Sequence, residues 1–495
     1  MTLVANPVSI ELDDIQGLLL RGFGQLPLSH FFFVRIGDAG IVRKMLRQIV
    51  PFITPATRYK SDLSMNVAFS HSGLKAIGLS DNNLRNFPIP FKVGMTDRVR
   101  QRMLGDWGQS APENWIWGGQ KQDPVHILLA LYASDPDQIN RFREDIRKKI
   151  NHFRSQKSTI DTASQKPAIE IVYEISGYRR DDGKENFGFH DSISQPVIRG
   201  SGRRGPDNDI VATGEFVLGY QNEHNLYPYS PLITDDQGNL NLLSTDANGS
   251  GHKDLGKNGT FIAFRQIQQY VDNFWEFMKT NTMRSNGEED KHAQIRLASK
   301  MIGRWPGGAP LVKFPENDPG VEDTDNDFGY AEEDPHGYKC PLGSHLRRNN
   351  PRDSFRDQGD KQSLKVTKRH RIIRRGRLYD LGQEGNHEKG LLFMGLNADL
   401  QQQFEFIQHI WSNNLQPNKK TLYNDPDPVI GVPDDKDPRH RQGKADYRFA
   451  MQQEPVTKYV SGLERFVRIR GGGYFFLPGI SAVRYLATLG GEKED

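Results

Sequence analysis

The sequence predicts an α+β protein made of two ferredoxin-like (split βαβ) domains, with antiparallel sheets and peripheral helices. The chain has 495 residues, which is more than one hydrophobic core normally supports. The elements expected in the first part follow the order β-α-β-insert-β-α-β, and the second part repeats this pattern with longer loops. We therefore expect an N-terminal domain over residues 1–185 and a C-terminal domain over residues 186–495.

In the first domain, short runs of aromatic and β-branched residues predict strands, and apolar residues at helical spacing predict helices. The expected strands cover residues 30–36, 66–69, 125–132 and 168–175. The expected helices cover residues 39–53, 73–79 and 135–151. Ser72 is expected to cap the second of these helices.

The same criteria predict the strands and helices of the second domain, which longer loops connect. The expected strands cover residues 214–220, 259–264, 369–379, 389–396 and 473–477. The expected helices cover residues 267–278, 398–411 and 481–489. Polar stretches are expected to form long loops at residues 221–256, 280–295, 315–338 and 412–447.

The charge of the chain is nearly balanced, because 65 basic and 62 acidic residues give a formal net charge of +3. This balance gives no general argument for binding to a nucleic acid or an anionic membrane. The single cysteine, Cys340, excludes a disulfide within the chain and fits a reducing compartment. Residues 1–14 show no Sec-type leader, and no apolar run is long enough to cross a bilayer. The expected location is the cytoplasm, without a membrane or nucleic-acid partner.

Two motif-like stretches are better explained as loops. Residues 200–205, GSGRRG, match a dinucleotide-binding fingerprint, but the PDND that follows does not start a helix. Residues 323–327, DTDND, imitate a calcium loop but place Phe328 where the sharp turn needs glycine. Neither HExxH nor a CxxC pair occurs, so the sequence gives no support for a zinc site.

Three stretches carry side chains of catalytic character. Asp191 lies in residues 188–196, GFHDSISQP, where it either caps a tight turn or serves as an acid/base in a pocket. His345 follows the turn residues of CPLGSHLRR and is either a surface residue or a metal ligand, and Cys340 is an alternative thiolate ligand. Arg374 shares one face of a basic strand with Ile372, so an inward Arg374 would need an anion, a ligand or a structural ion pair.

Taken together, these stretches resemble the haem-dependent dye-decolorizing peroxidases. The distal motif of that family, GxxDG followed by SQP, is matched by residues 188–196. The proximal motif, CPxGAHxRxxNPR, resembles residues 340–352, and the strand RIIRRGxxYG resembles residues 371–379. Two departures stand out: Ser192 replaces the last glycine of the distal motif, and Arg377-Leu-Tyr-Asp replaces the usual Ile-Pro-Tyr-Gly. The length of the chain is similar to that of the larger members.

The resemblance implies one haem b per chain, held mainly by the C-terminal domain. It implies that Asp191 is the distal acid/base, Arg374 the distal arginine and His345 the axial iron ligand. Other residues that it places at the haem are Ile193, Ser194, Gln195, Arg347, Leu391 and Phe393. Tyr379 matches a tyrosine that in some members relays electrons to the surface, and an outward position is expected for it because it lies five residues after Arg374.

The implied activity is the reduction of hydrogen peroxide coupled to the oxidation of bulky dyes or phenols. Asp191 would move a proton between the two peroxide oxygens, and Arg374 would stabilise the charge on the leaving oxygen. An acceptor for the second nitrogen of His345 is also needed, and Glu464 is one candidate. The alternatives are a haem carrier or sensor with the same pocket, and a nucleic-acid binder that uses the basic strand.

Overall fold

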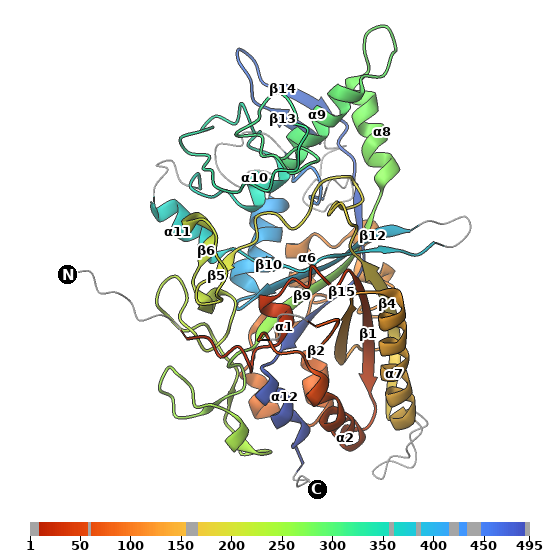
Figure 1. Ribbon diagram of the computed structural model, residues 1–495, viewed down its shortest axis with the longest axis vertical. Helices are drawn as coiled ribbons and strands as arrows, with labels where there is room; N and C mark the ends of the chain where they lie inside the picture. Colours follow the sequence, from red (N-terminus) through yellow and green to blue (C-terminus); the bar gives the residue numbers. More distant parts are fainter. Residues whose placement is uncertain are drawn as a thin grey trace, which may run out of the picture.

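The computed structural model describes residues 9–57, 61–154, 167–355, 361–382, 388–414, 425–432 and 447–490. Its main sheet contains nine strands in the order β10-β12-β11-β4-β1-β3-β2-β15-β9, and β12 also pairs with β9. This additional pairing closes the sheet into an antiparallel barrel (Figure 1). The strands are β1 (Leu28–Ile36), β2 (Leu63–Phe69), β3 (Ile127–Ala133), β4 (Ile169–Tyr178), β9 (Thr260–Gln269), β10 (Ile373–Arg374), β11 (Arg377–Asp380), β12 (Lys389–Asn397) and β15 (Val467–Leu477).

The strands of the barrel are apolar on both faces, because one face is enclosed and the other is covered by helices. On β1, Phe31 and Phe33 point into the barrel, while Phe32 and Val34 pack on the outside against helices. Three of these helices, α2 (Ala39–Ile49), α7 (Pro136–Arg154) and α12 (Ile480–Ala487), surround the lower part of the molecule in Figure 1. The predicted α+β class with antiparallel pairing and peripheral helices is confirmed.

A second group of elements lies beyond the barrel, in the upper half of Figure 1, and builds one side of the site. It comprises α8 (Val271–Thr282), α9 (Lys291–Ile302), α10 (His345–Asn349), β13 (Arg448–Met451) and β14 (Lys458–Ser461). Two π-helical segments follow β12, namely η7 (Gln401–Glu405) and η8 (Ile407–Ser412). The remaining α-helices of the described residues are α1 (Gly17–Leu20), α3 (His71–Ala76), α4 (Asp81–Arg85), α5 (Ile89–Val93), α6 (Arg98–Leu104) and α11 (Lys361–Arg369). The short strands are β5 (Val197–Ile198), β6 (Ile210–Val211), β7 (Leu232–Ile233) and β8 (Lys253–Asp254).

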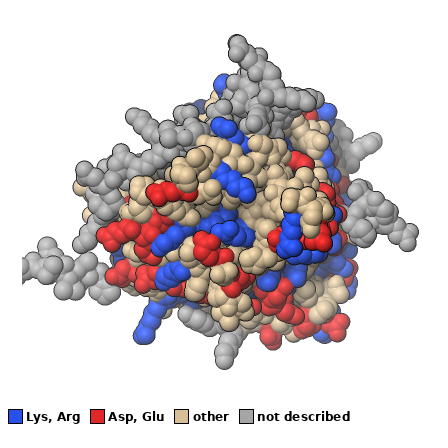
Figure 2. All heavy atoms as spheres, turned by 90° about the horizontal axis from the view of Figure 1, so that it is seen from above, with Lys and Arg blue, Asp and Glu red and all other residues tan. Residues whose placement is uncertain are grey.

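Strands from both halves of the chain share the one barrel: β1 to β4 form one side, and β9, β11, β12 and β15 complete it. The predicted division between residues 185 and 186 stays a prediction. Seen from above, basic side chains gather near the middle of the face and acidic ones flank them (Figure 2). This mixed surface agrees with the nearly balanced charge of the chain. Among the described residues, no helix has the length and apolar character needed to cross a membrane.

Several elements differ from those that the sequence predicts. Ser70, and not Ser72, caps α3 by accepting a hydrogen bond from the backbone N–H of Gly73. The run predicted as a strand at residues 214–220 is a buried turn, because Gly219 has a φ of 82°. The strand predicted to end at residue 264 continues to Gln269, so the next helix, α8, begins at Val271. The predicted loop 280–295 contains the start of α9, which Asp290 caps.

The basic segment predicted as one strand, residues 369–379, also differs. Helix α11 ends at Arg369, and the two short strands β10 and β11 follow it. Arg375 and Gly376 separate these strands, and both strands pair with β12. Part of the predicted loop 412–447 lies outside the described residues.

Candidate active site

A cavity of ≈ 290 Å³ lies against the outer face of the barrel, where β9, β12 and β15 contribute Ile267, Leu391, Phe393 and Ile469. Six of the sequence-predicted residues line it together: Asp191, Ser194, His345, Arg374, Leu391 and Phe393. They come from three stretches that are far apart in the chain, so the fold brings together the predicted acid, imidazole and guanidinium.

Asp191 reaches the cavity at the end of a turn that follows β4. The carboxylate of Glu185 fills this turn and accepts hydrogen bonds from the backbone N–H groups of Phe187 (2.9 Å) and Phe189 (3.0 Å). The backbone N–H of Asp191 donates to the carbonyl oxygen of Gly183 at 2.9 Å. A Cβ on Gly376 would lie 3.5 Å from Oδ2 of Asp191, which places this glycine next to the carboxylate. Asp191 therefore has a fixed backbone and a side chain that faces the cavity.

The substitution of serine for the motif glycine has a direct structural consequence. Ser192 adopts a φ of 67°, and Ser194, two residues later, adopts a φ of 62°. Both values lie in the left-handed region, where a Cβ is unfavourable. The backbone N–H of Ser192 donates to Oδ1 of Asp191 at 2.6 Å. The turn thus combines the two roles considered for Asp191, a local cap and a cavity-lining carboxylate.

The loop that follows Asp191 forms hydrogen bonds with both the backbone and the side chain of Arg374. Its backbone N–H donates to Oε1 of Gln195 at 3.0 Å, and its guanidinium donates to the carbonyl oxygen of Ile193 at 2.7 Å. Ile372 lines the cavity beside it, as the strand alternation predicted, whereas Ile373 points into the barrel. No carboxylate lies within ion-pair distance of Arg374 in the part of the chain that the structure describes. Ile193 and Gln195 position this arginine and do not line the cavity.

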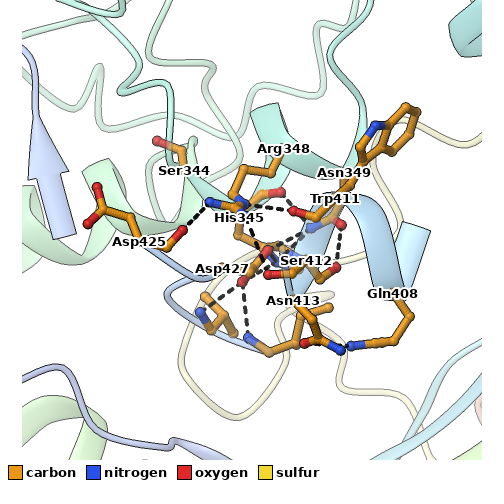
Figure 3. Close-up of polar contacts among 12 residues, drawn as sticks. Ser344, His345, Arg348, Asn349, Gln408, Trp411, Ser412, Asn413, Asp425 and Asp427 are labelled. Atoms are coloured by element: carbon orange, nitrogen blue, oxygen red, sulfur yellow. Dashed lines mark hydrogen bonds and ion pairs between the residues drawn. The ribbon is translucent and has the colours of Figure 1, made fainter. Parts of the chain in front are cut away.

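His345 begins α10 and faces the cavity, and its Nδ1 lies 2.9 Å from Oδ2 of Asp427 (Figure 3). A carboxylate only accepts, so Nδ1 carries the proton and Nε2 is left for a metal. Burial alone would raise the pKa of Asp427, but the charge of His345, their hydrogen bond and Arg348 lower it to about 2. The acceptor that the sequence left open is therefore Asp427, and Glu464, which is exposed, was the wrong candidate.

Arg347, which was predicted at the haem, and Cys340, the alternative ligand, also lie outside the cavity wall. Arg347 is buried away from the cavity, where its guanidinium pairs with Asp334 at 2.8 Å and donates to the carbonyl oxygen of Cys340 at 2.7 Å. Cys340 itself is 0 % exposed and does not line the cavity. Burial also raises the pKa of its thiol. The structure thus favours His345 over Cys340 as the residue available to a metal.

The expected outward position of Tyr379 is wrong. Its side chain is 0 % exposed and lies inside the barrel, where its hydroxyl donates to Oε1 of Glu388 at 2.9 Å. Burial and the charge of Glu388 raise the pKa of Tyr379 far above its usual range. Tyr379 does lie on the opposite face from Arg374, but the closure of the sheet makes that face the interior.

Three arginines that sequence reasoning missed line another part of the cavity, and all three are buried: Arg304, Arg352 and Arg371. Arg371 pairs with Asp209 at 3.2 Å and donates to the carbonyl oxygen of Ser194 at 2.8 Å, while Arg304 and Arg352 share the side chain of Asn326. Burial and the neighbouring charge of Arg352 lower the pKa of Arg304 to about 10, which leaves it charged at neutral pH. These guanidiniums form a cationic end that suits carboxylate groups.

The rest of the wall is mostly apolar, and its polar members include a buried ion pair between Arg265 and Asp106. Its apolar members include Ile302, Leu346, Phe404, Ile407, Val429 and Ile430. An apolar slot, an imidazole backed by a carboxylate and a cationic end match the macrocycle, the iron and the propionates of a haem. The groups that line this cavity are therefore suited to hold a haem.

Comparisons with known proteins show which proteins this chain is similar to. The profile of the DyP dimeric alpha+beta barrel domain matches residues 14–180. A dye-decolorizing peroxidase of Exidia glandulosa is 27% identical, with 96% of this chain and 87% of the relative covered. Peroxidase 2 of Mycetinis scorodonius is 28% identical, with 97% and 88% covered. The crystal structure of a fungal DyP-type peroxidase from Auricularia auricula-judae superposes with a TM-score of 0.74 at 25% identity, with 97% of this chain and 100% of that chain covered. Over nearly its whole length, the chain is therefore similar to dye-decolorizing peroxidases.

Proposed function

We propose that this chain reduces hydrogen peroxide at a haem bound through His345 and takes the electrons from bulky dyes or phenols. The observation that carries the proposal is the cavity shared by Asp191, Arg374 and His345, in which His345 has its Nδ1 committed to Asp427. Relatives named as dye-decolorizing peroxidases, which are similar to nearly the whole chain, support the same activity.

The residues available to hold one haem b fall into three groups. Nε2 of His345 would bind the iron, Leu391 and Phe393 would lie along the ring, and the cationic end of Arg304, Arg352 and Arg371 would bind its carboxylates. When bound, the haem supplies a redox-active iron at which the bond between the peroxide oxygens is broken. The fully buried Asp427 orients His345 and increases the electron density on the imidazole.

Asp191 and Arg374 divide the remaining chemistry between them. Asp191 takes the proton from one peroxide oxygen and returns it to the other, which leaves as water. Arg374 places a positive charge in a largely apolar cavity, where it stabilises the negative charge that develops on the leaving oxygen. The apolar side chains of Leu391 and Phe393 limit the water beside these groups. Two electrons from the reductant and two protons complete the reduction to two molecules of water.

Tyr379 remains our proposed electron relay, now as an internal one. Its ring packs against Gly390, where an added Cβ would lie 2.6 Å from Cε1, and the next residue, Leu391, lines the cavity. Oxidation of a tyrosine releases the phenolic proton, and the carboxylate of Glu388 is hydrogen-bonded to the hydroxyl and can accept it. Large reductants that do not enter the cavity would need a step of this kind.

The test is an absorption spectrum of the purified chain with haem, taken before and after peroxide, together with the rate of peroxide-dependent dye oxidation. The proposal expects a histidine-ligated ferric spectrum, a spectral change on adding peroxide and continued turnover. A stable haem complex with no turnover would instead indicate the carrier or sensor. A cytoplasmic location, and the absence of nucleic-acid and membrane partners, stay predictions.

A further inference from the structure

Asn349, in the last turn of α10, lies beside the imidazole of His345 and contacts the same carboxylate (Figure 3). Its Nδ2 donates to Oδ2 of Asp427 at 2.7 Å and to the carbonyl oxygen of His345 at 2.8 Å. Its Oδ1 accepts a hydrogen bond from Oγ of Ser412 at 2.7 Å. The side-chain amide therefore links the helix that carries His345 to the end of η8.

The orientation of this amide is determined by its neighbours. Two oxygens that only accept, one from Asp427 and one from the backbone of His345, flank the same amide atom, so that atom must be the NH₂ group. A flipped amide would place its oxygen against both acceptors. Ser412, on the other side, then donates to the amide oxygen and holds this orientation.

The carboxylate of Asp427 receives donors at both oxygens. Oδ1 accepts from the backbone N–H groups of Val429 (2.9 Å) and Ile430 (3.0 Å). Oδ2 accepts from Asn349 (2.7 Å) and from Nδ1 of His345 (2.9 Å), which lies slightly farther from Oδ1 (3.1 Å). Asn349 thus shares one oxygen with His345, and a shared acceptor binds each donor less strongly than an unshared one.

We propose that Asn349, held by Ser412, is a positioning residue that weakens the His345–Asp427 hydrogen bond and thereby limits the electron density that the imidazole gives to a bound iron. This inference rests on the proposed function, because it concerns His345 as the axial ligand. Without Asn349, Asp427 would be a stronger acceptor, the imidazole would be more anionic, and the ferric state would be favoured.

The test compares the ferric/ferrous reduction potential of haem-loaded variants. Asn349→Leu has a similar size and lacks both donors, so at a fixed potential its ferrous-to-ferric ratio should fall about tenfold, a shift of about −59 mV. The iron–imidazole stretching band of the ferrous protein, measured by resonance Raman, should move to higher frequency. Ser412→Ala leaves the amide in place but unrestrained, and should shift both signals in the same direction by less.

Asn281→Leu is the matched control. Asn281 lies in α8 and donates to the carbonyl oxygen of Phe277 at 3.0 Å, four residues before it, as Asn349 does to His345. It should leave the potential and the Raman band unchanged. An unchanged potential in Asn349→Leu, or an equal change in Asn281→Leu, would overturn the inference. Should Asn349→Leu not fold, Ser412→Ala decides in the same way.

Failure of the proposed function gives a different result. In that case the wild-type chain would not bind haem, or His345→Ala would bind it with an unchanged spectrum. Normal histidine-ligated binding in the wild type, with no effect of Asn349→Leu on either signal, would reject the role of Asn349 alone.

Discussion

Oδ2 of Asp427 lies 2.9 Å from Nδ1 of His345, although 82 residues separate the two in the chain. Asp427 is fully buried, and it receives further hydrogen bonds from Asn349 and from two backbone N–H groups. Because its charge is so well satisfied, it stays ionised and fixes the orientation of the imidazole. Asp427 therefore leaves Nε2 of His345 as the imidazole nitrogen available to a ligand.

Asp427→Asn should weaken haem binding by about 10- to 100-fold, because the neutral amide is a poorer acceptor for the N–H of His345. Titration of the haem-free protein with hemin measures this affinity. Asp425→Asn is the control, since the neighbouring Asp425 contacts Arg348 through its backbone carbonyl. Its affinity should remain near that of the wild type. Equal losses in both variants would mean that the segment supports the site only through its fold.

His345→Ala should abolish or scramble haem binding, whereas Cys340→Ser should leave the spectrum unchanged. His345 lines the cavity, while Cys340 is fully buried and lies outside its wall. The absorption and electron paramagnetic resonance spectra of the two reconstituted variants distinguish an imidazole from a thiolate ligand. Loss of the haem signal in Cys340→Ser together with a normal signal in His345→Ala would reverse the ligand assignment.

Asp425 should make the stability of the protein depend on pH. Burial raises its pKa to about 7, against the effects of Arg348 and Arg448, whereas an aspartate in the unfolded chain titrates near about 3.9. The folded state therefore binds this proton more tightly, so its stabilising contribution is complete below about pH 4 and is lost as the pH rises through about 7.

Asp425→Asn removes this titration. Relative to the wild type, the free energy of unfolding of the variant should rise between pH 4 and pH 8, by on the order of 2 kcal/mol. Urea denaturation at several pH values measures the difference. If the difference in the free energy of unfolding between the variant and the wild type stayed constant from pH 4 to pH 8, Asp425 would have the same pKa in the folded and unfolded states.

Ser192→Gly should stabilise the protein by about 0.5–1 kcal/mol. Ser192 has a φ of 67°, which costs a residue with a Cβ roughly 1–2 kcal/mol, while the greater freedom of glycine in the unfolded chain offsets part of the gain. Urea denaturation measures the change. Ser192→Ala keeps the Cβ and should give no gain, so an equal gain in both variants would attribute the effect to the loss of the hydroxyl.

The sequence predicted much of this site because its principal residues lie in contiguous motifs. Asp191, His345 and Arg374 could each be located from their neighbours, and Ile372 follows from strand alternation. Asp427 could not, since its stretch has no periodicity and its partner is distant in the chain. Tyr379 shows a different limit: the alternation placed it correctly opposite Arg374, but one strand carries no information about whether the sheet closes.

The same limit explains the errors in the fold. Buried turns and buried strands have similar apolar composition, so residues 214–220 resembled a strand although Gly219 bends the chain there. In β9, the polar residues Arg265 and Gln269 face the cavity and interrupt the apolar pattern. The predicted strand was therefore too short. The departure in β9 lies at the site, where function constrains the residue types.

Asp191→Asn should slow the reaction of the ferric protein with peroxide by roughly 100- to 10,000-fold, because the amide keeps the shape of the side chain but carries no proton between the two oxygens. Oδ1 of Asp191 accepts a hydrogen bond from the backbone N–H of Ser192, and the amide oxygen of asparagine can keep this contact. The substitution therefore changes the other carboxylate oxygen, Oδ2. Rapid mixing with peroxide measures the rate.

Arg374→Leu supplies the comparison, since it removes the positive charge but keeps Asp191. It should also slow the reaction, and the two effects need not add, because residues that act as one catalytic unit are not additive. Glu185→Gln tests the support of the turn: it should slow the reaction less, because the remaining carbonyl oxygen can still accept one backbone N–H of the two that Glu185 binds. If Asp191→Asn reacted at a near-normal rate while Arg374→Leu was inactive, Asp191 would not be the residue that transfers the proton. Arg374 would then be the main distal group.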